Sequence, residues 1–247
     1  IGTVTDLSIT TYASRLTPLL KAFKKAGLDR INISLDSIYS DRFERVTLTG
    51  FYHEVFHTVF NTLEAGFPVK LNMVTLRGLT EKEIIDFVSL ADKYPLEVRF
   101  LEFMPLCGTG WKKEEFLPIK DVRSIVMEHF DLTEIPREGH AAQSFSIRNG
   151  SGRVGFIASL TESFCRDCSR IRLSCDGRIL PCLFSDRQVS VKELLQQKAP
   201  DEDIMNVIQE AAKIKPAGNQ FRDRPFEMTH DSEPVYAKAP YIRKIGG

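Results

Sequence analysis

Three cysteines in the last third of the chain have the residue type and spacing of metal ligands. Cys165 and Cys168 form a C-x2-C pair, and Cys182 follows after thirteen intervening residues, directly behind a proline. A C-x2-C pair turns two sulfurs toward one point, and Asp176-Gly177 favours a hairpin turn that returns the third. The pattern therefore predicts a thiolate metal site, and an iron–sulfur cluster is its first interpretation.

Two other interpretations of these cysteines stay open. Cys175 could complete a four-thiolate zinc site, although its place just before the tight turn could carry its side chain away from the others. The cysteines could also be ordinary core residues, but four of the five lie between positions 165 and 182, a density above ordinary usage. Cys107 stands apart in a glycine-containing loop and is assigned no chemistry.

Four basic residues are candidates for an anion site. Arg170 and Arg172 are two residues apart, so on a strand both would point to the same face, where guanidinium groups can bind phosphate in pairs of hydrogen bonds. Lys70 and Arg99 interrupt otherwise apolar strands, and a charge inside a sheet is costly unless it meets a counter-ion or a ligand. The alternative for each pair is a solvated strand face.

The elements that must position these residues follow an alternating pattern. The first hundred residues alternate β-branched or apolar runs with amphipathic stretches, which is typical of βα units around a parallel sheet. Strands are predicted at residues 7–11, 30–35, 69–76 and 97–103, and helices at 16–25, 53–65 and 81–93. Thr80 and Glu83 have the spacing of a capping box at the start of the third helix. The predicted fold class is therefore α/β, with a partial (βα) barrel.

The pattern changes after Pro105. Short strands joined by Asn149-Gly150 and Asp176-Gly177, both favoured hairpin turns, indicate antiparallel pairing. Further helices are predicted at residues 119–129, 191–197 and 203–214. The sequence therefore predicts two regions, residues 1–105 with the βα units and residues 106–247 with the antiparallel strands, the helices and the cysteines.

Polar residues gather where the predicted parallel strands end, which is the edge at which ligands collect in such sheets. Together with one methionine they are Thr10, Thr11, Ser34, Asp36, Asn72, Thr75, Glu102 and Met104. Four βα units are too few to close a barrel. We therefore expect that further βα units precede this chain in a complete protein.

Charge and hydropathy exclude several classes of partner. The chain has 33 basic and 33 acidic residues, so no overall field attracts it to nucleic acid or to an anionic membrane. It has no apolar run long enough to span a membrane and no signal segment. An odd number of clustered cysteines suits a reducing compartment. The sequence predicts a cytoplasmic protein without a nucleic-acid or membrane partner.

Several segments together resemble a known family. They are Cys165–Arg172, Pro181–Phe184, Arg99–Pro105, Asn32–Ser37 and the terminal Gly246-Gly247. In combination they resemble the MoaA-type GTP 3′,8-cyclases, radical SAM lyases of molybdenum cofactor (molybdopterin) biosynthesis, over essentially the whole chain. The resemblance implies an incomplete TIM-type barrel and the conversion of GTP to (8S)-3′,8-cyclo-7,8-dihydroguanosine 5′-triphosphate.

The resemblance also implies ligands for particular residues. A 4Fe-4S cluster would be bound by Cys165, Cys168 and Cys182. GTP would be bound by Thr10, Lys70, Arg99, Arg170 and Arg172, and S-adenosylmethionine by Ser34 and Met104. Gly246 and Gly247 would form a tail that reaches the active site, and no residue is assigned a catalytic role. The implied functional partner is cyclic pyranopterin monophosphate synthase, and a homodimer is left open.

Two departures from the family pattern limit the expected activity. The family generates its radical on a second 4Fe-4S cluster held by a C-x3-C-x2-C motif, which this sequence does not contain. We therefore expect that cluster and S-adenosylmethionine only in a full-length enzyme, and no activity of this chain alone. Lys215–Asn219 reads K-P-A-G-N where the family often has K-P-x-x-H. Two alternative functions stay open: another radical SAM enzyme with an auxiliary cluster, or a non-catalytic zinc module.

Overall fold

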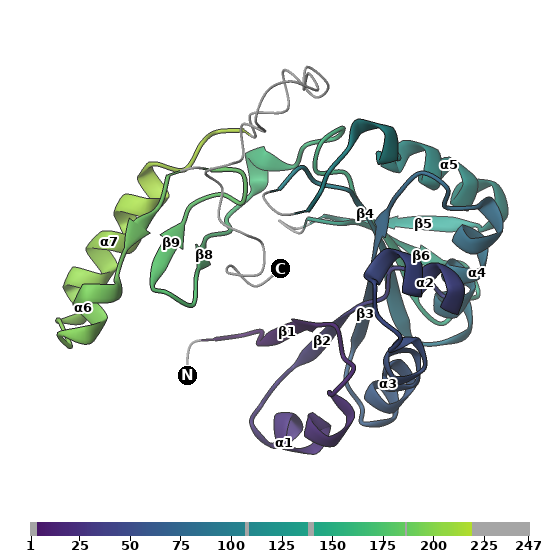
Figure 1. The fold of residues 1–247 in the computed structure, drawn as a ribbon, viewed down its shortest axis with the longest axis horizontal. Helices are drawn as coiled ribbons and strands as arrows, with labels where there is room; N and C mark the ends of the chain where they lie inside the picture. Colours follow the sequence, from purple (N-terminus) through teal and green to yellow (C-terminus); the bar gives the residue numbers. More distant parts are fainter. Residues whose placement is uncertain (1–3, 107–108, 138–140, 186, 219–247) are drawn as a thin grey trace. The chain divides into compact units, whose positions relative to one another are not determined.

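The computed structural model describes residues 4–106, 109–137, 141–185 and 187–218, in two compact units (Figure 1). The first unit comprises Ile1–Phe103 and Phe116–Ala158, and the second comprises Met104–Glu115 and Ser159–Gly247. Cys107 and the terminal Gly246 and Gly247 lie outside the described residues. The predicted division of the chain at residues 105 and 106 stays a prediction.

The first unit is built on a seven-stranded sheet in the order β1-β2-β3-β4-β7-β6-β5. The first five strands in that order are parallel, and β6 and β5 continue the sheet antiparallel. The strands are β1 (Ser8–Thr11), β2 (Arg30–Ser34), β3 (Val69–Thr75), β4 (Leu96–Glu102), β5 (Leu132–Ile135), β6 (Gln143–Ile147) and β7 (Arg153–Ile157). The predicted α/β class is confirmed, and the four predicted parallel strands are present.

Helices cover one face of this sheet (Figure 1). They are the 3-10 helix η1 (Thr17–Leu19) and the α-helices α1 (Leu20–Lys25), α2 (Ser40–Thr47), α3 (Tyr52–Glu64), α4 (Glu81–Lys93) and α5 (Ile119–His129). Along β3, Val69, Leu71 and Met73 are fully buried against them while the residues between are not. This alternation leaves the second face of the sheet for polar side chains.

Local sequence signals explain most of these elements. The Thr80 hydroxyl accepts a hydrogen bond from the Glu83 N–H, which is one half of the predicted capping box. The Glu83 carboxylate instead contacts Ser37 and Arg42. Asn149, with φ of 61°, lies in the turn between β6 and β7. The sequence did not indicate α2, a short and largely polar helix in which Phe43 is the one buried residue.

An aromatic cluster ties α4 to three strands of the sheet. The ring of Phe100 lies 5.4 Å from that of Phe87 and 6.0 Å from that of Phe156, measured between centroids. Phe145 on β6 meets Phe156 edge-on at 5.8 Å. All four side chains are buried, so this cluster fixes how α4 sits on β4, β7 and β6.

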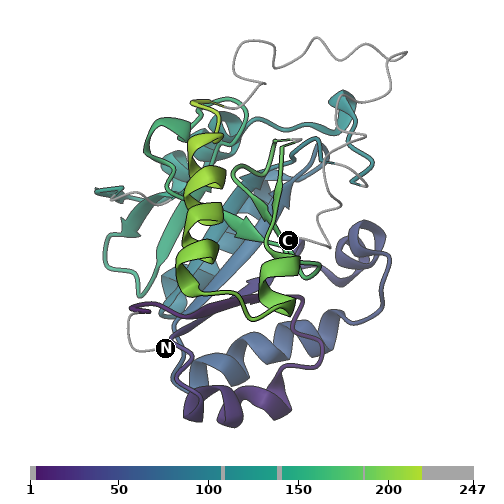
Figure 2. The same ribbon diagram turned by 90° about the vertical axis from the view of Figure 1, so that its left-hand side faces the viewer.

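The second unit contains a small antiparallel sheet in the order β10-β9-β8. Its elements are η2 (Lys113–Glu115), η3 (Cys165–Asp167), β8 (Arg172–Leu173), β9 (Arg178–Leu180), β10 (Val189–Ser190), α6 (Lys192–Gln196) and α7 (Asp201–Lys213). Gly177, with φ of 81°, forms the predicted turn between β8 and β9. Figure 2 shows α7 beside this sheet, where Ile179, Val191 and Ala211 form a small core. Within the described residues, no helix is both long and apolar enough to cross a membrane.

We predict that Phe100→Ala lowers the free energy of unfolding by about 3–5 kcal/mol, because it removes a fully buried ring at the centre of the aromatic cluster. Urea unfolding followed by circular dichroism measures the change. Met127→Ala on the exposed side of α5 is the matched control, with an expected change of about 0.5 kcal/mol or less. Equal losses in the two variants would contradict this account of the core.

Candidate functional site

Polar side chains occupy the face of the first unit's sheet that the helices leave open. The strand register places Asn32 beside Lys70, Lys70 beside Glu97, and Asn72 beside Arg99. Residues paired in this way project to the same side of a sheet. We call this surface the polar face, and its members are Thr10, Arg30, Asn32, Ser34, Lys70, Asn72, Glu97, Arg99 and Ser144.

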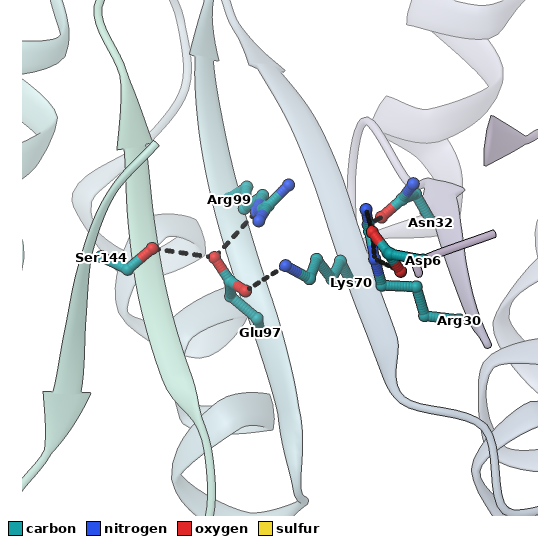
Figure 3. A network of polar contacts seen from close by, with 7 residues as sticks. All are labelled: Asp6, Arg30, Asn32, Lys70, Glu97, Arg99 and Ser144. Atoms are coloured by element: carbon teal, nitrogen blue, oxygen red, sulfur yellow. Dashed lines mark hydrogen bonds and ion pairs between the residues drawn. The ribbon is translucent and has the colours of Figure 1, made fainter. Parts of the chain in front are cut away.

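The centre of the polar face is the carboxylate of Glu97 (Figure 3). One of its oxygens lies 3.1 Å from Lys70 Nζ, and the other accepts hydrogen bonds from Arg99 Nε at 2.8 Å and from Ser144 Oγ at 3.1 Å. The side chains of Lys70 and Arg99 are only 22% and 16% exposed. Both strand charges therefore meet a counter-ion instead of lying on a solvated face, and their contacts with GTP stay a prediction.

The charges on the polar face shift one another's pKa values. Burial alone would raise the pKa of Glu97, but Arg99 and Lys70 outweigh it and hold that pKa below the usual value. Burial, together with the nearby charge of Arg99, lowers the pKa of Lys70, and Glu97 partly opposes this. Glu97 is thus ionised at neutral pH and supports the charged form of its lysine neighbour.

Arg99 keeps hydrogen-bonding capacity for a ligand. Within the described part of the chain it bonds through Nε alone, so both terminal nitrogens of its guanidinium group have no protein partner. Guanidinium nitrogens only donate, and a phosphate or carboxylate oxygen is their preferred acceptor. Arg99 and Lys70 together therefore offer donors and positive charge to an anion.

A chain of hydrogen bonds sets the direction in which Thr10 donates. Asp6 accepts from Arg30 Nε at 2.8 Å, Arg30 Nη1 donates to Asn32 Oδ1 at 3.4 Å, and Asn32 Nδ2 donates to Thr10 Oγ1 at 3.1 Å. Because arginine can only donate, the oxygen of the Asn32 amide faces Arg30 and its nitrogen faces Thr10. The hydroxyl proton of Thr10 is then directed toward some other acceptor, such as a ligand oxygen.

Asn72 presents an unpaired acceptor on the same face. Its Oδ1 atom is buried and has no hydrogen-bond partner among the described residues. Buried polar atoms are normally paired, so an unpaired acceptor suggests that a donor arrives with a ligand. Its register neighbour on β2 is Ser34, one of the two residues predicted to bind S-adenosylmethionine. The other, Met104, belongs to the second unit, where its carbonyl accepts from the Leu106 N–H at 2.9 Å.

The three predicted metal ligands lie near one another in the second unit. Cys165 begins η3, and the Cys168 N–H bonds back to its carbonyl at 3.3 Å. Burial, the largest cause, raises the pKa of Cys182, and the charges of the Cys165 and Cys168 thiolates raise it further. The three thiols are therefore within electrostatic reach of one another, whereas Cys175 is exposed.

Cations surround these thiols. Lys215 Nζ donates to the carbonyls of Cys168 at 2.6 Å and Arg170 at 2.7 Å and lies 3.5 Å from Cys168 Sγ. Burial would raise the pKa of Cys168, but the Arg170 N–H and the charges of Lys215 and Arg170 lower it below the usual value. In the sequence, Lys215 stands in the K-P segment without a predicted role.

The two arginines of this loop differ from the predicted arrangement. The strand β8 begins only at Arg172, so Arg170 lies in the loop before it and the two do not share one strand face. Arg170 instead lies over the ring of Phe164, 5.1 Å from its centroid. Burial, and then the charge of Arg170, lowers the pKa of Arg172, so the two guanidinium groups are still electrostatic neighbours. Aromatic stacking at Phe164 and the short strand account for the difference.

We call the segment from Cys165 to Cys182 the thiol loop, and the sequence predicts a metal site on three of its cysteines. Within the described residues, no group of three or more His, Cys, Asp or Glu side chains could hold a metal ion. Among these residues, neither the four-thiolate zinc site nor a three-thiolate metal site is assembled. Thiolates that ligate different irons of a cluster stand further apart than ligands on one ion, and the cations around Cys168 offset their negative charge. Cysteine thiolates are the donors that iron–sulfur clusters use, and a cluster on Cys165, Cys168 and Cys182 stays a prediction.

The parallel sheet with its polar face, together with the thiol loop, defines a protein of the radical SAM class. Residues 2–91 match the radical SAM superfamily, and residues 96–221 match a family described as Molybdenum Cofactor Synthesis C. The chain belongs to this molybdenum cofactor synthesis family of radical SAM proteins. The sequence contains no C-x3-C-x2-C motif, so its cysteines do not fit the radical-generating cluster of that superfamily.

Curated relatives agree with this family. A protein named GTP 3′,8-cyclase from Syntrophomonas wolfei is 40% identical over 88% of this chain and 68% of its own length. The mitochondrial GTP 3′,8-cyclase of Arabidopsis thaliana is 38% identical over 87% of the chain and 56% of its length. Molybdenum cofactor biosynthesis protein 1 of Bos taurus is 36% identical over 93% of the chain and 39% of its length. The chain thus spans about two thirds of the bacterial relative and less of the other two.

We predict that Lys215→Met slows the alkylation of Cys168 by iodoacetamide in reduced, metal-free protein at neutral pH. Loss of the lysine charge raises the pKa of the Cys168 thiol and so reduces its reactive thiolate fraction. Mass spectrometry of the peptides gives the rate for each cysteine. Exposed Cys175 is the internal control, and its rate should not change. An unchanged rate at Cys168 would show that Lys215 does not act on this thiol.

Proposed function

We propose that this chain is the GTP-binding part of a GTP 3′,8-cyclase, which converts GTP to (8S)-3′,8-cyclo-7,8-dihydroguanosine 5′-triphosphate in molybdenum cofactor biosynthesis. Its family and the names of its relatives support the pathway and the reaction. The observation that carries the proposal is the pair of Lys70 and Arg99, two partly buried cations held by one carboxylate on the polar face. Such a pair suits an anionic nucleotide.

The triphosphate is the part of GTP that the polar face would bind. Lys70 supplies a compact positive charge, and Arg99 supplies the free end of a planar guanidinium group. Thr10 would donate its hydroxyl proton to a phosphate or ribose oxygen, because Asn32 already occupies its acceptor side. Arg170 and Arg172 in the second unit are further proposed GTP contacts.

The thiol loop would hold a 4Fe-4S cluster on Cys165, Cys168 and Cys182. When bound through three thiolates, such a cluster supplies one iron with an open coordination position for an atom of the guanine base. The residues of this chain hold it by charge as well as by ligation, because Lys215, Arg170 and Arg172 lie around the thiols. The loop would thereby fix the base while the arginines take up negative charge.

S-adenosylmethionine would bind at Ser34 and Met104, and the unpaired Asn72 Oδ1 beside Ser34 supports a ligand at that part of the polar face. Reductive cleavage of S-adenosylmethionine needs the cluster that the C-x3-C-x2-C motif binds. We therefore expect no turnover from a chain without that motif. We propose that cyclic pyranopterin monophosphate synthase is the functional partner that uses the reaction product. The proposed compartment is the cytoplasm, and a homodimer is left open.

We predict that Cys168→Ser removes most of the iron and sulfide from anaerobically reconstituted protein and weakens its binding of GTP. The serine hydroxyl is a poor ligand for iron compared with a thiolate. Elemental analysis and calorimetric titration with GTP measure the two effects. The matched control is Cys175→Ser, which changes an exposed cysteine of the same loop region and should leave both unchanged. If iron content and GTP affinity survive in Cys168→Ser, the ligand assignment is wrong.

A further inference from the structure

Glu97 places a negative charge inside a site that we propose binds an anion, which is unusual. It is 7% exposed, and it lies on the polar face between the two cations that we propose for the triphosphate. Neither the spacing of residues nor the family resemblance assigned it a role. A carboxylate at this point repels phosphate, so its presence needs a compensating physical effect.

The compensating effect is that Glu97 fixes the positions of two neighbouring cations. Lys70 and Arg99 lie on adjacent strands, and the charge of Arg99 lowers the pKa of Lys70. Without a counter-ion the two side chains would repel and turn apart. Glu97 lies between them and uses a separate oxygen for each, at 3.1 Å from Lys70 Nζ and 2.8 Å from Arg99 Nε. Because Arg99 bonds through Nε, its guanidinium plane is fixed with the terminal nitrogens left for a ligand.

Two neighbouring residues are arranged to hold Glu97 in this position. Ser144 on β6 donates its hydroxyl to the same oxygen that accepts from Arg99, at 3.1 Å. Gly155 on β7 pairs with both Arg99 and Ser144, and a Cβ atom there would lie 3.0 Å from Glu97 Oε1 and 3.3 Å from Arg99 Cγ. Glycine therefore leaves the room that the ion pair occupies.

The arrangement is open to a ligand. A cavity of about 350 Å³ lies at the N-terminal ends of β3, β4 and β7, and Lys70, Glu97 and Arg153 are among the residues that line it. An ion pair that only stabilised the fold would need no access from outside. Glu97 and Lys70, by contrast, line this cavity. With Arg99 they also belong to the polar face (Figure 3).

We propose that Glu97 is a positioning residue for the triphosphate, which holds Lys70 and Arg99 in the geometry that receives phosphate oxygens. This inference rests on the proposed GTP site. A preorganised pair binds an anion more tightly than two mobile cations, because the cost of ordering the side chains is met during folding. The gain from order outweighs the repulsion between the carboxylate and phosphate.

Calorimetric titration of anaerobically reconstituted protein with GTP, guanosine and inorganic tripolyphosphate tests this inference. Glu97→Gln keeps the size and an acceptor oxygen but removes the charge that holds Lys70. We expect it to weaken GTP and tripolyphosphate binding by on the order of tenfold and to leave guanosine binding unchanged. Ser144→Ala should have a smaller effect in the same direction, and it changes no charge. The matched control is Glu134→Gln on the exposed part of β5, with wild-type affinities.

The outcomes separate this inference from the proposed function. If Glu97→Gln binds GTP as well as or better than wild type, Glu97 is only a structural or opposing charge and the inference is wrong. If it weakens guanosine binding equally, a general structural loss explains the result and the inference also fails. If wild-type protein binds tripolyphosphate but not GTP, the proposed substrate is wrong. The effect of Glu97→Gln on tripolyphosphate binding then still tests the role of Glu97. Wild-type protein that binds neither overturns both.

Discussion

The ion pairs between Glu97 and its two cationic neighbours impose the main constraint on the first unit. A carboxylate this buried is stable only with partners that replace water, and Lys70, Arg99 and Ser144 supply them from three strands. Those strands must therefore lie in one register, with their apolar residues turned to the helices. The aromatic contacts around Phe100 fix that register from the opposite face. The core and the polar face thus depend on the same pairing of β3 with β4.

The second unit also places cations beside an anionic group of the protein. There the cations are Lys215, Arg170 and Arg172, and the group that Lys215 and Arg170 stabilise is the Cys168 thiolate. Thiols become useful metal ligands when they are ionised, and the cations favour that form at Cys168. Both units therefore hold positive charge beside a protein anion, a carboxylate in one and a thiolate in the other. Each arrangement suits a ligand with a large negative charge, which a nucleoside triphosphate and a thiolate-bound cluster both have.

The sequence predicted the features that depend on local patterns. Apolar alternation located β1 to β4, the pairing of Thr80 with Glu83 located α4, and Asn149-Gly150 located the hairpin of β6 and β7. The helix α2 was missed because it buries a single residue. Glu97 was seen only as the first residue of a strand, since its role depends on the cross-strand register with Lys70 and on space left by Gly155. The contact of Lys215 with the thiol loop likewise joins residues 47 positions apart, which no local pattern reveals.

The most direct test of the account is a crystal structure of anaerobically reconstituted protein with GTP, recorded with anomalous scattering at the iron edge. The account predicts an iron peak bounded by the sulfurs of Cys165, Cys168 and Cys182, with the triphosphate within hydrogen-bonding distance of Lys70 and the terminal nitrogens of Arg99. Iron bound elsewhere, or a triphosphate that leaves Lys70 and Arg99 without contact, would contradict the central claim that these two sets of residues hold the cluster and the substrate.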